Sequence, residues 1–216
     1  MIASASPTIR RPVAQRGLSV VELLIGIAIT AMVALAIGAM LTMVAKASAR
    51  SRDDQSILMR AHLAQSRLRA YAEPALCVLS VDPAQGVAIW LQDPTPGLTV
   101  NLTELRVLWF DSSTQQVYIE RVEFPTNWTP LMKQQADVAL PKTSDFFATM
   151  LAQRAAGMTV TDTLLDTVST FDLSYTGATA QASDHVRFAL TLISDAGDPR
   201  LLYVAVGLSN HTEPTS

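Results

Sequence analysis

Cysteine and charge are both scarce in this chain. Its single cysteine, Cys77, has no partner for an intrachain disulfide, so a disulfide-stapled scaffold is excluded. Charged residues make up 16% of the 216 residues, against roughly 25% in ordinary soluble domains. Only one long stretch lacks charge altogether, which excludes a protein with several membrane spans. The apolar excess therefore belongs to one segment of an otherwise ordinary globular sequence.

Motifs for catalysis, metal binding and nucleic-acid binding are missing as well. The three histidines, His62, His185 and His211, lie far apart in the sequence and in no metal-ligand spacing. No nucleophile elbow, phosphate-binding loop or dinucleotide glycine pattern occurs. The net charge is −3, without the basic cluster that nucleic-acid binding needs. We therefore expect a protein that is not an enzyme, holds no cofactor or metal, and does not bind nucleic acid.

The charges that are present divide unevenly along the chain. Residues 1–17 contain three arginines and no acid, giving +3, whereas residues 18–216 contain 13 basic and 19 acidic residues, giving −6. Residues 18–45 hold 22 apolar residues in 28 positions, and no charge occurs from Leu23 to Ala45. As a helix this uncharged stretch would measure roughly 35 Å, enough to cross a hydrocarbon core of about 30 Å with some tilt. A basic head before such a run predicts an export or membrane signal.

A cleaved secretory signal is the competing interpretation of this segment. The apolar region of such a signal is typically about 7–15 residues long and ends at small residues, which Ala34 and Ala36 could supply. The run nevertheless continues to Val44, which favours a retained span. Glu22 does not fit a simple anchor, because a carboxylate facing lipid costs a few kcal/mol. It therefore either has a partner or stays hydrated at the level of the lipid headgroups.

A glycine, an apolar residue and a glutamate stand in a fixed spacing just before the span. In the stretch RGLSVVELLI, Gly17 is followed by Leu18, and Glu22 is the fifth residue after the glycine. This stretch resembles the class III signal of type IV prepilins and type II secretion pseudopilins. The resemblance implies cleavage after Gly17 by a prepilin peptidase, N-methylation of Leu18, and a role for Glu22 in subunit assembly.

Three departures from the pattern of major pilins favour a minor pilin or a pseudopilin. The first mature residue would be Leu18 where the family usually has phenylalanine, and a leader of 17 residues is long for a major pilin. The helix-kinking proline of major pilins is absent, because no proline occurs between Pro12 and Pro74. The C-terminal strands are also similar to the ending of W-type minor pilins and J-type pseudopilins. This similarity rests on Phe171–Tyr175, Val186–Leu192 and Val204–Asn210.

Behind the span, apolar residues recur at the three- and four-residue spacing of one helix face. They are Ile57, Ala61, Ala64, Leu68 and Tyr71. Pro74 ends this helix, with Ala72 or Glu73 as the expected boundary. Because no glycine or proline occurs between Gly38 and Pro74, span and stripe are predicted to form one continuous helix.

After Pro74 the pattern changes to strands separated by turn residues. We expect strands at Leu76–Val81, Val87–Leu91, Leu105–Phe110, Val117–Phe124, Ser169–Tyr175, Val186–Ile193 and Leu201–Leu208. Ser144 is a candidate N-cap for a helix that runs to about Ala155 and stops at Gly157. Residues 125–143 contain three prolines and are expected to form a long surface loop.

Several residues of reactive or metal-binding types are expected to have structural roles only. Cys77 lies in a predicted strand and is expected to be a small buried hydrophobe. Asp195 and Asp198 carry the oxygens that Ca²⁺ prefers, but no further acidic ligand is adjacent, which favours a solvated turn. The three tryptophans are expected to pack in the core or under loops.

These observations predict an α+β, pilin-like fold, in which a long N-terminal helix packs on a mostly antiparallel β-sheet head domain. The segments are a cleaved leader (1–17), a transmembrane and assembly helix (18–45), its continuation (46–73) and a periplasmic head domain (74–216). The expected protein is a single-pass inner-membrane subunit of a type IV pilus or type II secretion pseudopilus. Its partners would be the prepilin peptidase, other pilins or pseudopilins, the inner-membrane assembly platform and membrane lipid. The alternative is a periplasmic binding or enzyme domain on an uncleaved signal anchor.

Overall fold

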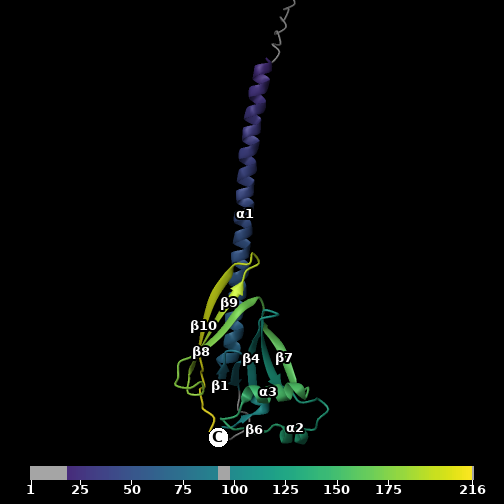
Figure 1. The fold of residues 1–216 in the computed structure, drawn as a ribbon, viewed down its shortest axis with the longest axis vertical. Coiled ribbons are helices and arrows are strands. Elements are labelled where there is room, and N and C mark those ends of the chain that lie inside the picture. Colours follow the sequence, from purple (N-terminus) through teal and green to yellow (C-terminus); the bar gives the residue numbers. More distant parts are fainter. Residues whose placement is uncertain (1–18, 92–97, 216) are drawn as a thin grey trace, which may run out of the picture. The chain divides into compact units, whose positions relative to one another are not determined.

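The computed structural model describes residues 19–91 and 98–215 (Figure 1). The chain divides into two compact units, residues 1–50 and residues 51–216. We call the second of these the head unit. Helix α1 (Val20–Ala72) contributes residues to both units.

Helix α1 is one uninterrupted element of 53 residues, as the sequence predicts. It ends at Ala72, where Glu73 still donates its N–H to the carbonyl of Arg69, two residues before Pro74. In the first unit, every described residue of the helix is exposed. In the head unit, the predicted stripe is buried at Ile57, Ala64 and Leu68 and partly buried at Ala61 and Tyr71, and Ala72 is buried as well. The periodicity therefore identified the helix face that enters the core.

A five-stranded antiparallel sheet forms the centre of the head unit. Its order is β1-β2-β4-β5-β7. The strands are β1 (Cys77–Asp82), β2 (Gly86–Trp90), β4 (Leu105–Asp111), β5 (Gln116–Val122) and β7 (Thr159–Leu165). The predicted strands at these positions are confirmed, and they pair as the antiparallel hairpins β1–β2 and β4–β5. Gly86 is required in the first, because its φ is +109° and a Cβ there would lie 1.9 Å from the carbonyl oxygen of Leu108.

A three-stranded antiparallel sheet follows, in the order β10-β9-β8. It comprises β8 (Val168–Tyr175), β9 (His185–Ile193) and β10 (Pro199–Gly207). All three strands were predicted to within two residues at each end. β7 was not predicted, because the polar residues Thr161, Asp162 and Thr163 interrupt its apolar pattern and are exposed. It is held by pairing with β5 and, at its C-terminal end, by Leu164 and Leu165, which are buried in the core.

The two faces of the five-stranded sheet support two separate hydrophobic clusters. Alternate side chains of β2 illustrate the division, since Val87 and Ile89 join α1 and the three-stranded sheet in one cluster. Ala88 and Trp90 join the other, which includes helix α3 (Phe146–Ala155). Strand alternation thus covers both faces of the sheet. The N-cap of α3 is Asp145, one residue after the predicted Ser144, and the predicted stop at Gly157 has φ +70°.

The prediction of a long loop over residues 125–143 is wrong. This segment contains helix α2 (Pro130–Ala136) and strand β6 (Ala139–Leu140). β6 pairs with β3 (Val100–Asn101), which leads into the 3₁₀ helix η1 (Leu102–Glu104). Thr129 caps α2 by accepting the N–H of Met132, and a proline at the first helical position is favourable because its missing N–H is not needed there. No residue of α2 is buried, so no apolar stripe marked it in the sequence.

Candidate assembly helix and pockets of the head unit

The first turn of α1 contains a reciprocal pair of hydrogen bonds. The N–H of Ser19 donates to Oε2 of Glu22 at 2.9 Å, and the N–H of Glu22 donates to Oγ of Ser19 at 3.2 Å. This is a capping box, which satisfies two backbone donors at the start of a helix. Glu22 also lies where the helix dipole favours a negative charge. The sequence signal Ser-x-x-Glu was visible, but the capping role of Glu22 was missed. Gly17 and Leu18 lie outside the described residues.

Small residues follow Glu22 along α1 at four-residue intervals. Gly26, Thr30 and Ala34 line a shallow groove together with Glu22. The hydroxyl of Thr30 donates to the carbonyl of Gly26 at 2.7 Å, so its polar atom is satisfied within the helix. A Cβ added at Gly26 would meet nothing within 4 Å. Packing inside this chain therefore does not require small residues here.

By length and composition, α1 could cross a membrane. None of the residues in its most apolar 18-residue stretch is buried by the rest of the chain. Fifteen large apolar side chains between Val20 and Val44 are each more than half exposed. A signal sequence near an N-terminus meets the same criterion. What is distinctive here is that the same helix continues into the head unit and is buried there.

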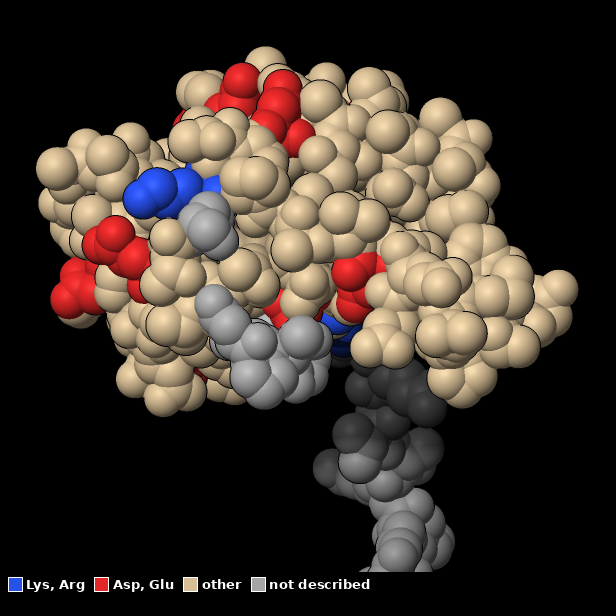
Figure 2. All heavy atoms as spheres, turned by 90° about the horizontal axis from the view of Figure 1, so that it is seen from below, with Lys and Arg blue, Asp and Glu red and all other residues tan. Residues whose placement is uncertain are grey.

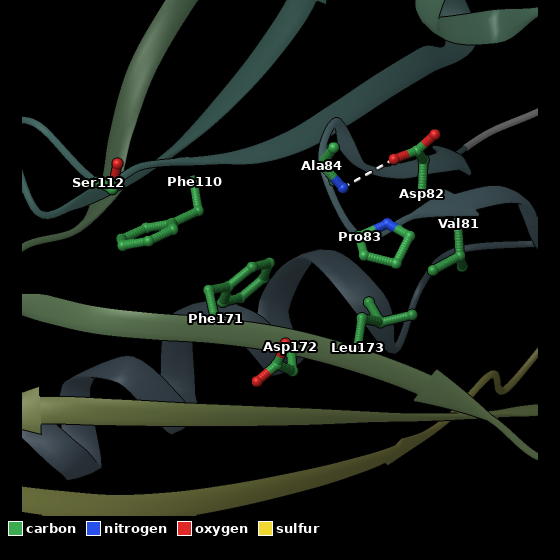
Figure 3. Close-up of a pocket in the computed structure, with 10 residues that line it drawn as sticks. Val81, Asp82, Pro83, Ala84, Phe110, Ser112, Phe171, Asp172 and Leu173 are labelled. Atoms are coloured by element: carbon green, nitrogen blue, oxygen red, sulfur yellow. Dashed lines mark hydrogen bonds between the residues drawn. The ribbon is translucent and has the colours of Figure 1, made fainter.

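A cleft of about 260 Å³ with both polar and apolar lining lies in the head unit between the β1–β2 turn, β4 and β8. Phe110, Phe171 and Leu173 point into it, and Pro83 faces them from the turn (Figure 3). The carboxylate of Asp82 is engaged within its own turn, where it accepts the N–H of Ala84 at 2.7 Å. That hydrogen bond lowers the pKa of Asp82. Its apolar side chains can take up an apolar group, and Asp172 also lines the cleft.

A second, smaller cleft lies beside a buried ion pair. Glu120 is fully buried and both of its carboxylate oxygens are bound by Arg154, with Nε at 2.9 Å from Oε1. The hydrogen bond to Glu120 raises the pKa of Arg154. Its guanidinium also lies 5.1 Å from the ring centroid of Trp109, which stacks on Tyr118. Because Arg154 belongs to α3 and Glu120 to β5, this arrangement holds α3 on the sheet.

Tryptophans and Cys77 are placed as expected. Trp90 is fully buried and donates its indole N–H to Glu104 at 3.0 Å, while Trp128 stacks on Phe124. Cys77 is free and fully buried, and burial raises its pKa to about 12. A thiol in that state is a poor nucleophile.

Potential metal ligands do not gather in the part of the chain that the structure describes. No group of three or more His, Cys, Asp or Glu residues there could hold a metal ion. Asp195 instead accepts hydrogen bonds from Arg60 and Ser56, and the bond from Arg60 lowers its pKa. On the face shown in Figure 2, acidic and basic side chains form small separate patches on a mostly uncharged surface.

Comparison with known proteins adds no relative. No protein-family model matches the chain, and no curated protein or solved structure matches it significantly. The family resemblance therefore rests on the residues around Glu22 and on an architecture compatible with it.

Proposed function

We propose that the protein is a structural subunit, a minor pilin or type II secretion pseudopilin, with no enzymatic activity of its own. One observation carries the proposal. The first half of α1 exposes all of its apolar side chains, while one face of the second half of the same helix is buried in a folded unit. Such a helix needs two environments, one supplied by its own chain and one supplied from outside.

The outside environment must be apolar. Exposed apolar surface of this size is strongly unfavourable in water, and lipid would cover it before assembly. In a filament, neighbouring helices of other pilins or pseudopilins would replace the lipid. The small residues Gly26, Thr30 and Ala34 support such contacts, since small side chains let helix backbones approach closely.

Glu22 would change partner when the leader is removed. Cleavage after Gly17 creates an α-amino group on Leu18, which is positively charged near neutral pH. This ammonium would lie one helical turn from Glu22 and would compete with the N–H of Ser19 for its carboxylate. In a filament, the ammonium of a neighbouring subunit could do the same. Pairing between subunits would then select their axial register.

The proposal implies a defined set of partners and a location. The prepilin peptidase would cut and methylate the chain, and the inner-membrane assembly platform would move it from lipid into the filament. The protein would span the inner membrane once with the head unit in the periplasm. Low stoichiometry or a place near the filament tip agrees with the departures from major pilins.

Processing is the step that tests the proposal. A prepilin peptidase site needs a residue with almost no side chain before the cut, so Gly17→Val should leave the precursor inserted and full length. Gly26→Val is a matched control, because the same change is made at a helix position with open space. Membrane fractions from cells that co-express a prepilin peptidase would be compared by immunoblot. Wild type and Gly26→Val should be shortened and Gly17→Val should not. A normally shortened Gly17→Val chain, or an uncut wild type, contradicts the proposal.

A further inference from the structure

The tip of the β9–β10 hairpin lies against α1 near the start of the head unit (Figure 1). Asp195 accepts hydrogen bonds from Nη2 of Arg60 at 2.6 Å and from Oγ of Ser56 at 3.2 Å. The N–H of Ala196 donates to Asp53 at 3.3 Å. Arg60 also donates to the carbonyl of Ile193 at 3.3 Å. Several polar contacts thus join one hairpin tip to two turns of the helix.

The hairpin tip is pre-organised for these contacts. The N–H of Ser194 donates to the carbonyl of Asp198 at 3.0 Å, and the N–H of Asp198 donates to Oγ of Ser194 at the same distance. Gly197 adopts φ +87°, a conformation that favours glycine, and its N–H donates to the carbonyl of Ser194. The carboxylate of Asp195 is therefore presented by a closed turn and not by a loose loop.

The helix side of the contact has no apolar anchor before Ile57. Ile57 is the first buried residue of α1, and residues 51–56 contain none. Asp53 and Ser56 are joined to the hairpin tip by hydrogen bonds with the N–H of Ala196 and with Asp195. These contacts are only partly shielded from solvent, since the side chain of Asp195 is 61% exposed and that of Arg60 is 31% exposed. Ion pairs in such positions contribute little and are screened by salt.

We infer that the β9–β10 tip is a salt-sensitive latch on α1. When it is closed, the head unit holds the helix from Asp53 onward. When it is open, the first residue of α1 that packs on the sheets is the buried Ile57, and about one more turn of the helix is released from them. The charged side chains in contact at the latch are Asp53, Asp54 and Arg60 on α1, and Asp195 and Arg200 on the hairpin.

Disulfide trapping in the full chain, in detergent micelles, measures how often the latch is closed. The pair Asp53→Cys and Ala196→Cys sits where a side chain and a backbone N–H are in contact, and the native Cys77 is too buried to compete. Raising NaCl from 0.05 to 0.5 M should slow disulfide formation by roughly threefold or more, since such salt shortens the screening length of exposed pairs. Adding Arg60→Gln should slow it to a similar degree.

Two controls give the experiment its meaning. Arg121→Gln removes another exposed arginine that pairs with an aspartate, Asp162, but on β5 and away from the latch, so it should leave the trapping rate unchanged. The exchange Arg60→Glu with Asp195→Arg should recover most of the rate lost in Arg60→Gln. A rate that is independent of salt and equal in Arg60→Gln and Arg121→Gln would mean that the tip is fixed. A pair that never forms a disulfide would mean that the latch is not closed in solution. Either result overturns the inference.

Discussion

The two halves of α1 use similar apolar side chains in opposite ways. Between Val20 and Val44, large apolar side chains are exposed and none is buried. Between Ile57 and Ala72, four residues of one face are buried, including the completely covered Leu68. The chain itself covers the apolar face of the second half, whereas it leaves the apolar side chains of the first half exposed. The same kind of substitution should therefore affect folding in one half and membrane insertion or assembly in the other.

The largest effect is expected when the two halves are separated. A chain that begins at Ser51 keeps the buried stripe and both clusters of the sheet, so it should fold without the first unit. Its Cys77 should react with a thiol reagent at pH 8 about a thousandfold more slowly than an unfolded thiol, because burial raises the pKa to about 12 from a reference near 8.5. Labelling followed by mass spectrometry measures this ratio. Rapid labelling without denaturant would show that the head unit depends on the rest of the chain.

Within the second half, burial should decide the cost of losing a leucine. Leu68→Ala removes a side chain that is 0% exposed and should lower the free energy of unfolding by about 2–5 kcal/mol. Leu63→Ala makes the same change at a position that is 48% exposed, and should cost less than about 1 kcal/mol. Urea unfolding followed by tryptophan fluorescence compares the two. Equal losses would contradict the placement of the buried face.

Within the first half, a charge should disturb insertion and leave folding alone. Ile29→Arg places a cation in the middle of the apolar run, where insertion scales assign a cost of about 2.5–3.5 kcal/mol. The membrane-bound fraction should fall, while the protection of Cys77 stays unchanged. Ile29→Leu is the control and should behave as wild type. If Ile29→Arg exposes Cys77, the first half contributes to the folded head unit after all.

The smallest effect is expected at Glu22, where two roles can be separated. Glu22→Val removes both the capping interaction and the charge, whereas Glu22→Gln keeps a capping-box residue and removes only the charge. Cleavage and insertion should continue in both. If charge pairing orders the subunits, both variants should lower cysteine crosslinking to partner pilins by about two- to fivefold. This range corresponds to the free energy of up to about 1 kcal/mol that an exposed ion pair contributes. Normal crosslinking in Glu22→Gln with a loss in Glu22→Val would reduce Glu22 to a helix cap.

Periodic patterns predicted most of this fold because burial and pattern coincide. The stripe from Ile57 to Tyr71 and the alternating strands after Pro74 are the residues that enter the two clusters. Elements without a regular pattern of buried residues were missed for the same reason. α2 buries nothing and begins with the pair Thr129 and Pro130, a local signal that an apolar pattern cannot reveal. β7 exposes its three middle residues and buries the adjacent pair Leu164 and Leu165 at its end, so its apolar residues do not alternate along the strand.

The candidate site was predictable only in part. Sequence spacing singled out Glu22, and the structure gives it a capping partner, Ser19, that the same four residues could have revealed. The contacts of Asp195 with Arg60 join positions 135 residues apart, so no local pattern could indicate them. The ion pair of Glu120 with Arg154 is similar, since it depends on how α3 docks on the sheet. Long-range polar contacts follow from the fold and not from the sequence pattern.

The mass of the mature chain tests the central claim, that the first half of α1 is a processed assembly segment. Protein purified from membranes with a C-terminal affinity tag would be analysed intact and after proteolysis. The account predicts an N-terminal peptide that begins at Leu18, lacks residues 1–17 and carries one additional methyl group. A chain that keeps Arg16 and Gly17 would contradict it and favour a periplasmic domain on an uncleaved anchor.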